Sequence, residues 1–174
     1  MGGSAAEAFR AWHDFYMLIA SAAATLIGAM FVVASIGAGF LTPRHTPQIR
    51  VYLTPTVIHL ASVLLAAAVT MAPSLDWRFL GLAFALGGTA GMAYSLVIGW
   101  QVARRRVEWS DQIWYALIPI VGYVVVLAAA LSIFLRTVPD LEALAVGLLL
   151  LFVAGIRNAW DLIVFFASRD NPPE

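Results

Sequence analysis

The chain has 174 residues, of which 62% are hydrophobic and 11% are charged, and its ten basic side chains are balanced by ten acidic ones. A water-soluble domain of this size leaves too much of its chain at the surface to hide so much apolar area, so the composition excludes a soluble enzyme and a nucleic-acid-binding protein. Because the chain has no cysteine, disulfides, iron–sulfur clusters and cysteine nucleophiles are excluded as well. The composition is typical of an integral membrane protein.

Long stretches without Asp, Glu, Lys or Arg divide the chain into five predicted helices. A helix needs about 20 apolar residues to cross the hydrocarbon of a bilayer. The spacing of the charged residues leaves five such stretches, the last of which is interrupted by Arg157 and Asp161. We therefore predict an all-α fold, a polytopic integral membrane protein built as one five-helix transmembrane bundle over 15–168. Its helices are expected at about 15–40, 55–73, 78–103, 112–135 and 141–168.

The segments around these helices carry helix-start signals. Thr54-Pro55 predicts an N-cap followed by a proline in the first turn of the second helix. Residues 1–14 are expected to form an amphipathic lead-in near the membrane interface, and a frayed tail is an equally open alternative. Residues 169–174 are expected to be a C-terminal tail.

The distribution of arginine predicts the orientation. With five spans, one face of the membrane collects six arginines and the other collects three. Because positive loops are retained in the cytoplasm, we predict an N-out, C-in topology. The short loops and the arginine bias favour a bacterial inner membrane.

Small residues mark candidate helix contacts. Since lipid gives no hydrophobic drive for helix association, close backbone approach must replace it. We expect Gly28, Gly87, Gly91 and Gly147 to serve helix packing, either within the chain or between copies of it in a homo-oligomer.

Polar residues inside the last predicted helix are the most informative feature. Arg157 and Asp161 are four residues apart, so they can pair on one helix face, and Asn158 lies beside them. A charged group at the bilayer centre costs about 2.5–3.5 kcal/mol on insertion scales, so these groups are expected to face protein or water. Two interpretations stay open: a structural ion pair, or part of a polar pathway or binding site.

The topology brings further polar side chains to the same half of the membrane. His59 lies near the start of the second helix, Tyr94 and Ser95 lie in the second half of the third, and Tyr123 lies in the first half of the fourth. These positions come from three helices and converge with Asp161. We predict a polar site there, while packing aromatics and a satisfied interfacial histidine remain the alternatives.

Other features predict less. The run Arg104, Arg105 and Arg106 is expected to act as a topology signal or to bind anionic lipid headgroups. The sequence lacks HExxH and GxSxG patterns and offers one histidine within the predicted spans, so we expect no enzymatic activity, no metal and no cofactor.

Three functions are compatible with this pattern. The first is a homo-oligomeric channel or permeation protein for ions or protons, with Arg157, Asn158, Asp161 and His59 at its polar site. The second is an accessory or scaffold subunit, whose partners are other membrane-protein subunits. The third is a lipid- or quinone-binding membrane protein. The lipid bilayer is a partner in every case, and nucleic acid in none.

Overall fold

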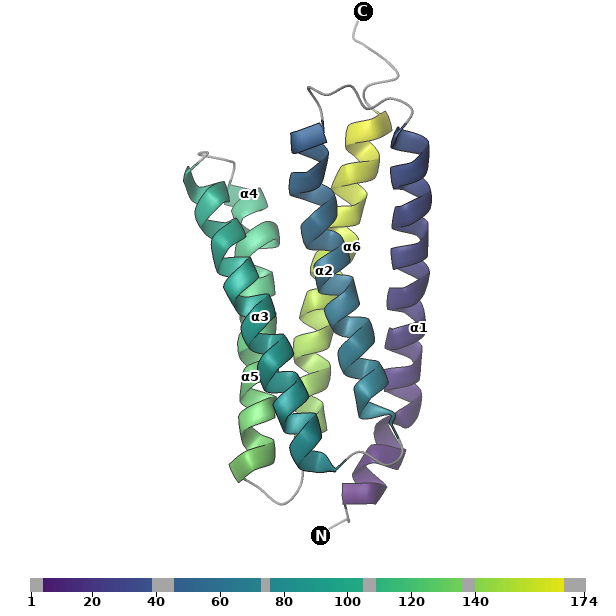
Figure 1. Ribbon diagram of the computed structural model, residues 1–174, viewed down its shortest axis with the longest axis vertical. Helices are drawn as coiled ribbons and strands as arrows, with labels where there is room; N and C mark the ends of the chain where they lie inside the picture. Colours follow the sequence, from purple (N-terminus) through teal and green to yellow (C-terminus); the bar gives the residue numbers. More distant parts are fainter. Residues whose placement is uncertain (1–4, 39–45, 73–75, 105–108, 136–139, 168–174) are drawn as a thin grey trace, which may run out of the picture.

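The computed structural model of the chain describes residues 5–38, 46–72, 76–104, 109–135 and 140–167, and all the secondary structure in these ranges is helical. Figure 1 shows the helices side by side along one long axis. They are α1 (Ala5–Ala38), α2 (Thr46–Thr70), α3 (Trp77–Arg104), the short α4 (Trp109–Gln112), the π-helical turn η1 (Ile113–Leu117), α5 (Ile118–Leu135) and α6 (Leu141–Ala167).

Five apolar segments in the described ranges are long enough to cross a membrane. They are Arg10–Ser35, Leu53–Thr70, Trp77–Arg104, Ser110–Leu135 and Leu141–Val164. The five helices expected from the charge-free stretches are thereby confirmed as long apolar helices of an all-helical chain. Their length and composition suit helices that cross a membrane.

The helices form two groups that α5 and α6 join. Helix α3 packs mainly against α5, whereas α2 packs against both α1 and α6, and α2 and α3 contact each other much less. Figure 1 shows the α3/α5 pair set apart from the other three helices at one end of the bundle. We call this the Arg104 end, where α3 and α6 finish and α2 begins, and we call the opposite end the Trp77 end.

Helix α2 begins earlier than the sequence predicts. It starts at Thr46, and Pro55 lies inside it, so the expected start at Thr54-Pro55 is wrong. Proline lacks a backbone N–H and therefore removes one hydrogen bond of the helix, but a helix can continue through it when packing holds both sides. The apolar part of α2 still begins at Leu53, close to the predicted boundary.

Helix α1 also starts before the predicted span. It runs without interruption from Ala5, so the described part of the 1–14 lead-in forms the first turns of the same helix. The placement of these turns at a membrane interface stays a prediction. The expected tail at 169–174 lies outside the described residues.

The core at the Trp77 end is closely packed and almost entirely apolar. Large buried side chains from α1, α5 and α6 meet there, and the buried hydroxyl of Tyr16 donates a hydrogen bond of 2.7 Å to the carbonyl oxygen of Leu141. This bond ties the start of α6 to α1.

Two of the four expected packing glycines lie at close helix contacts. A Cβ on Gly147 would lie 3.0 Å from the carbonyl oxygen of Gly122, and one on Gly91 would lie 2.1 Å from Cε1 of Tyr123. Gly28 and Gly87 have nothing within 4 Å of the same position, so they do not pack against another helix of this chain. A role for these two between copies stays a prediction.

Candidate functional site

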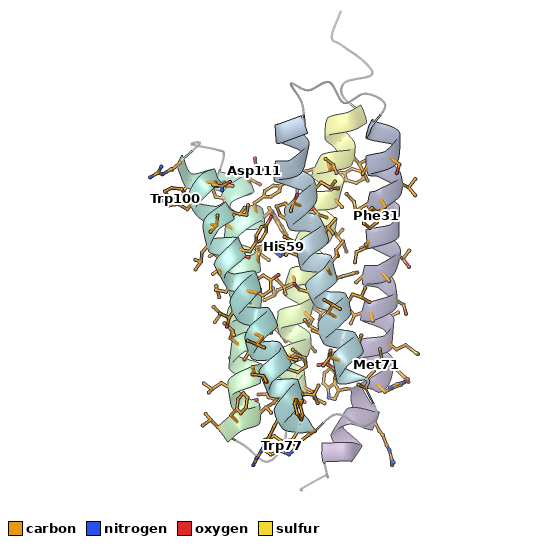
Figure 2. The ribbon with its side chains drawn as sticks, in the orientation of Figure 1. Phe31, His59, Met71, Trp77, Trp100 and Asp111 are labelled. Atoms are coloured by element: carbon orange, nitrogen blue, oxygen red, sulfur yellow. The ribbon has the colours of Figure 1, made fainter. Side chains whose placement is uncertain are left out.

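Tyr123 is the centre of a buried polar cluster between α2, α3 and α5. Its hydroxyl lies 3.1 Å from Nδ1 of His59 and 3.0 Å from Oγ of Ser62. The His59 ring also stands edge-on to Tyr94, with 6.4 Å between the ring centroids. His59 and Tyr123 are each 1% exposed, and Figure 2 shows His59 in the interior of the bundle, nearer the Arg104 end. Three of the predicted site residues are thus in contact.

The absence of a side chain on Gly91 allows Tyr123 to reach α2. The tyrosine ring lies directly on the α3 backbone at this glycine, where any Cβ would overlap the ring. The hydroxyl therefore extends past α3 to the two polar residues of α2. His59 and Ser62 are three residues apart, so they lie on neighbouring positions of one helix face.

The protons of this cluster have two consistent arrangements. In the first arrangement, Ser62 donates a hydrogen bond of 2.9 Å to the carbonyl oxygen of Ile58. Because each hydroxyl has a single proton, Tyr123 then donates to Ser62 and accepts from His59. In the other arrangement Ser62 donates to Tyr123, and Tyr123 donates to His59. The cluster can therefore present His59 in either tautomer.

A second polar group lies nearer the Arg104 end. Arg157 and Asp161 form an ion pair along α6, and the hydroxyl of Tyr115 donates a 3.1 Å hydrogen bond to Oδ2 of Asp161. The two charged side chains keep 34% and 26% of their surface exposed, whereas Tyr115 is buried. The expected pair is present and is anchored to a helix other than its own.

The π-helical turn positions Tyr115. Its five residues widen the helix, and the N–H of Ile118 donates to the carbonyl oxygen of Ile113 five residues earlier. In an ordinary α-helix, the N–H of residue 119 would bond to the carbonyl oxygen of Tyr115, but Pro119 has no N–H. An α-helical turn would therefore leave this carbonyl oxygen without its usual partner. The wider turn contacts both α3 and α6, and the hydroxyl of Tyr115 lies on Asp161 of α6.

Two buried polar side chains in the same half have no hydrogen-bond partner among the residues that the structure describes. Asn158 is fully buried, and neither its amide nitrogen nor its carbonyl oxygen is paired with any of these residues. Ser95 is 1% exposed, and its hydroxyl is likewise unpartnered. Leaving such a group unsatisfied costs about 1–3 kcal/mol in a folded protein. Ser95 lies between Gly91 and Gly99 on the side of α3 that faces α5, outside the Tyr123 cluster.

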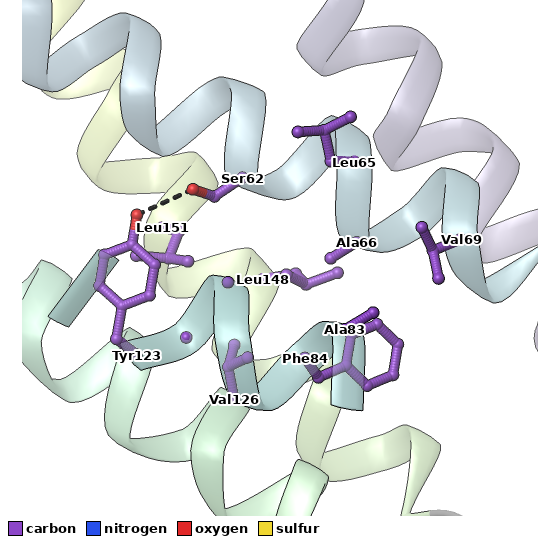
Figure 3. A pocket seen from close by; sticks show the side chains of 12 residues that line it. Ser62, Leu65, Ala66, Val69, Ala83, Phe84, Tyr123, Val126, Leu148 and Leu151 are labelled. Atoms are coloured by element: carbon purple, nitrogen blue, oxygen red, sulfur yellow. Dashed lines mark hydrogen bonds between the residues drawn. The ribbon is translucent and has the colours of Figure 1, made fainter. Parts of the chain in front are cut away.

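An apolar groove of about 300 Å³ begins at the Tyr123 cluster and runs between α2 and α3. Figure 3 shows Tyr123 and Ser62 at one end of it, and Val69 and Phe84 towards the other. Its rim includes Leu65 and Gly87, which are exposed at the bundle surface. The lining consists of Ser62, Leu65, Ala66, Val69, Ala83, Phe84, Gly87, Gly88, Tyr123, Val126, Leu148 and Leu151.

Two members of this site are absent from the set of predicted site residues. Ser62 carried a usable signal, since it lies one turn after His59 on the same face. Tyr115 carried a weaker one, because its direction depends on the π-helical turn. Arg104, by contrast, stacks over the Trp100 ring at 3.6 Å, while Arg105 and Arg106 lie outside the described residues. Their binding of lipid headgroups stays a prediction.

Neither the metal-binding residue types nor comparison with known proteins narrows the choice between the three expected functions. Among the described residues, no three His, Asp or Glu side chains lie close enough together to hold a metal ion. No known protein family, no curated protein and no solved structure shows significant similarity to this chain.

Proposed function

We propose that the chain is an integral membrane protein that binds a membrane-dissolved amphiphile in the groove between α2 and α3. The observation that carries this proposal is the shape of the groove: its walls are apolar along their length, and the hydroxyls of Tyr123 and Ser62 lie at one end. Binding sites for small amphiphiles combine such apolar walls with a few placed polar groups. Of the three functions expected from the sequence, this arrangement favours lipid or quinone binding.

The proposed placement in the membrane agrees with the ends of α3. Arg78 stacks on Trp77 at one end, with its guanidinium carbon 5.3 Å from the ring centroid, and Arg104 stacks on Trp100 at the other. Tryptophan and arginine favour the two interfaces of a bilayer. With the N-out, C-in topology, the Arg104 end faces the cytoplasm of a bacterial cell.

The depth of the polar cluster supports an amphiphile over a wholly apolar ligand. Ser62 lies near the middle of the Leu53–Thr70 segment, about 12–14 Å from either end at 1.5 Å per residue. The hydroxyls of Tyr123 and Ser62 are already hydrogen-bonded within the chain, but each oxygen can accept one further hydrogen bond from a ligand. We infer that the apolar part of the ligand lies along the groove towards Val69 and Phe84, with its polar end at Tyr123.

A pair of glycine substitutions tests the proposal. Gly87 lines the groove, and Gly28 lies on α1; both have open space where a side chain would start. Gly87→Leu is expected to fill the groove and to lower the amount of co-purifying amphiphile about tenfold, whereas Gly28→Leu leaves it unchanged. Mass spectrometry of organic extracts from the purified proteins measures both. Equal amounts in the two variants and the parent would overturn the proposal.

The polar end is tested separately with Tyr123→Phe. This change removes the hydroxyl and keeps the ring on Gly91. We expect the bound amphiphile to dissociate about tenfold more readily, as for the loss of one good hydrogen bond. Native mass spectrometry of detergent-released protein reports the bound fraction, and an unchanged fraction would contradict the assigned polar end.

The homo-oligomeric channel is the second candidate function. The observation that favours it is the partial exposure of Arg157 and Asp161, which a second copy of the chain would have to cover or use to line a polar route. Ion and proton flux in proteoliposomes tests it. Flux that is lost in Arg157→Ala and Asp161→Ala would support a channel, and the absence of flux across a range of pH and voltage would exclude it.

A further inference from the structure

Two hydroxyl groups are the polar side chains that line the groove between α2 and α3, among the residues that the structure describes. They belong to Tyr123 and to Ser62, which is half-buried, and the other lining residues are apolar. Figure 3 shows both hydroxyl oxygens at the same end of the groove, joined by their hydrogen bond of 3.0 Å. A ligand in the groove therefore meets a pair of neighbouring oxygens, whose protons decide which chemical group can bind there.

Both protons of this oxygen pair are already used within the chain. When Ser62 donates to the carbonyl oxygen of Ile58, Tyr123 donates to Ser62 and accepts from Nδ1 of His59. When Ser62 instead donates to Tyr123, the tyrosine proton goes to His59. Because a hydroxyl has one proton and two lone pairs, each oxygen keeps at least one lone pair in either arrangement. The pair can accept a hydrogen bond from a ligand, but it has no free proton to donate.

This asymmetry favours a ligand that donates a hydrogen bond. A ligand hydroxyl adds one bond to the cluster without breaking another. A ligand carbonyl has to take a proton from Ser62 or Tyr123, so the bond lost inside the chain offsets the bond gained. A hydrogen bond gained without such a loss corresponds to about tenfold in affinity.

The groove also disfavours a charged ligand group. No Asp, Glu, Lys or Arg is among its described lining residues, and the nearby ion pair of Arg157 and Asp161 is not part of it. In the proposed membrane placement, Ser62 lies about 12–14 Å from either end of its apolar segment. A charged group at this depth would lose its water without gaining a counterion, which is costly. The polar end of the ligand is therefore expected to be neutral.

We propose that the groove selects neutral amphiphiles that carry a hydroxyl group. The ligand hydroxyl donates to the oxygen pair of Ser62 and Tyr123, and the apolar chain lies along the groove. A long-chain alcohol has this chemistry, whereas a ketone offers only an acceptor and a sulfonate carries a charge. The inference rests on the proposed function, because it assigns the chemistry of the polar end of the same ligand.

Competition between probes of equal chain length tests this selectivity. The protein is reconstituted in nanodiscs of phosphatidylcholine, a lipid without hydroxyl or N–H groups, and binding of tritiated 1-dodecanol is measured by scintillation proximity. The competitors are 1-dodecanol, 2-dodecanone, dodecane and 1-dodecanesulfonate, with concentrations expressed as mole fractions of the lipid. We expect 1-dodecanol to bind about tenfold more tightly than 2-dodecanone and dodecane, and more tightly than the sulfonate.

Ser62→Ala tests whether the proton arrangement is the cause of the selectivity. Without the serine, His59 can donate to Tyr123, and the tyrosine proton becomes free for a ligand carbonyl. The preference for 1-dodecanol over 2-dodecanone is expected to fall from about tenfold to about twofold or less. Ser95→Ala is the matched control, because it removes a buried serine hydroxyl outside the groove, and it should keep the preference of the parent.

The outcomes separate this inference from the proposed function. If 2-dodecanone competes as well as 1-dodecanol in the parent while Gly87→Leu abolishes binding, the groove binds amphiphiles without selecting a donor, and this inference is overturned. An unchanged preference in Ser62→Ala, or tighter binding of the sulfonate than of 1-dodecanol, would overturn it too. If Gly87→Leu binds 1-dodecanol like the parent, or if no probe binds above the level of empty nanodiscs, the proposed function fails as well.

Discussion

The contact between α5 and α6 and the contact between α2 and α3 use glycine in opposite ways. Between α5 and α6, Gly122 and Gly147 bring the two backbones so close that a Cβ on Gly147 would lie 3.1 Å from the backbone nitrogen of Val126. Between α2 and α3, Gly87 faces open space and lines a groove. The same residue type closes one side of the bundle and leaves the other side open.

This difference separates a structural region from a region available for binding. The closed side holds the two helix groups together. The open side carries little of the packing, and it borders the Tyr123 cluster. Under the proposed function, the occupant of the groove could change without a change of fold.

The largest expected effect comes from placing leucine on the closed side. In Gly147→Leu the new side chain would meet Val126 and the backbone of Gly122, neither of which can move without separating the helices. We expect at least about 3 kcal/mol of destabilisation, the upper end of the usual range for overpacking. Unfolding of the purified protein in mixed micelles of increasing denaturing detergent measures this.

The matched substitution on the open side sharpens the comparison. Gly87→Leu should unfold within about 0.5 kcal/mol of the parent, since no atom occupies the space that the side chain enters. Similar destabilisation by Gly147→Leu and Gly87→Leu would contradict the distinction between the two sides.

A smaller but more specific effect is expected for Gly91→Ala. The added methyl group would overlap the Tyr123 ring, and because that ring is buried, it can move only by withdrawing its hydroxyl from His59 and Ser62. We expect about 1–3 kcal/mol of destabilisation. The unfolding experiment is repeated with Tyr123→Phe alone and combined with Gly91→Ala. The effects of Gly91→Ala and Tyr123→Phe should be non-additive, because Gly91→Ala already breaks the hydrogen bonds that Tyr123→Phe removes. Full additivity would mean that the ring adapts without losing its partners.

A smaller destabilisation than that of Gly91→Ala is expected at the ion pair. Asp161→Leu leaves Arg157 without its counterion and removes the acceptor of Tyr115. Because the pair is partly exposed, we expect a cost of about 1–2 kcal/mol, between the values for exposed and buried pairs. Adding Arg157→Leu should recover part of this stability in the same unfolding assay. A double variant that is less stable than Asp161→Leu alone would show that the arginine stabilises the fold independently of the aspartate.

The five long helices were predictable because charged residues rarely lie inside apolar helices, and the gaps between charges therefore fall at helix boundaries. Proline predicted the start of a helix less well, because the start proposed at Thr54-Pro55 lies inside α2. A local signal for a helix start gives no information about the preceding residues, which here continue the same helix.

The polar cluster was partly predictable from topology. The alternation of five helices brings His59, Tyr94 and Tyr123 to the same half of the bundle, and they are in contact there. The groove was not predictable, because its width depends on how closely α3 approaches α2. Nor does the spacing of Gly87 and Gly91 reveal that one faces open space while the other carries a tyrosine ring.

The π-helical turn Ile113–Leu117 amounts to one residue inserted into an otherwise α-helical segment. Eight residues separate Tyr115 from Tyr123, which in a regular helix would rotate them roughly 80° apart; with one residue absorbed by the wider turn, the angle falls to roughly 20°. Both tyrosines therefore project towards the bundle interior. A regular α-helical turn of the same chain length would rotate Tyr115 by about 80° relative to Tyr123 and away from Asp161, so the wider turn is what keeps the two tyrosine hydroxyls on a common side.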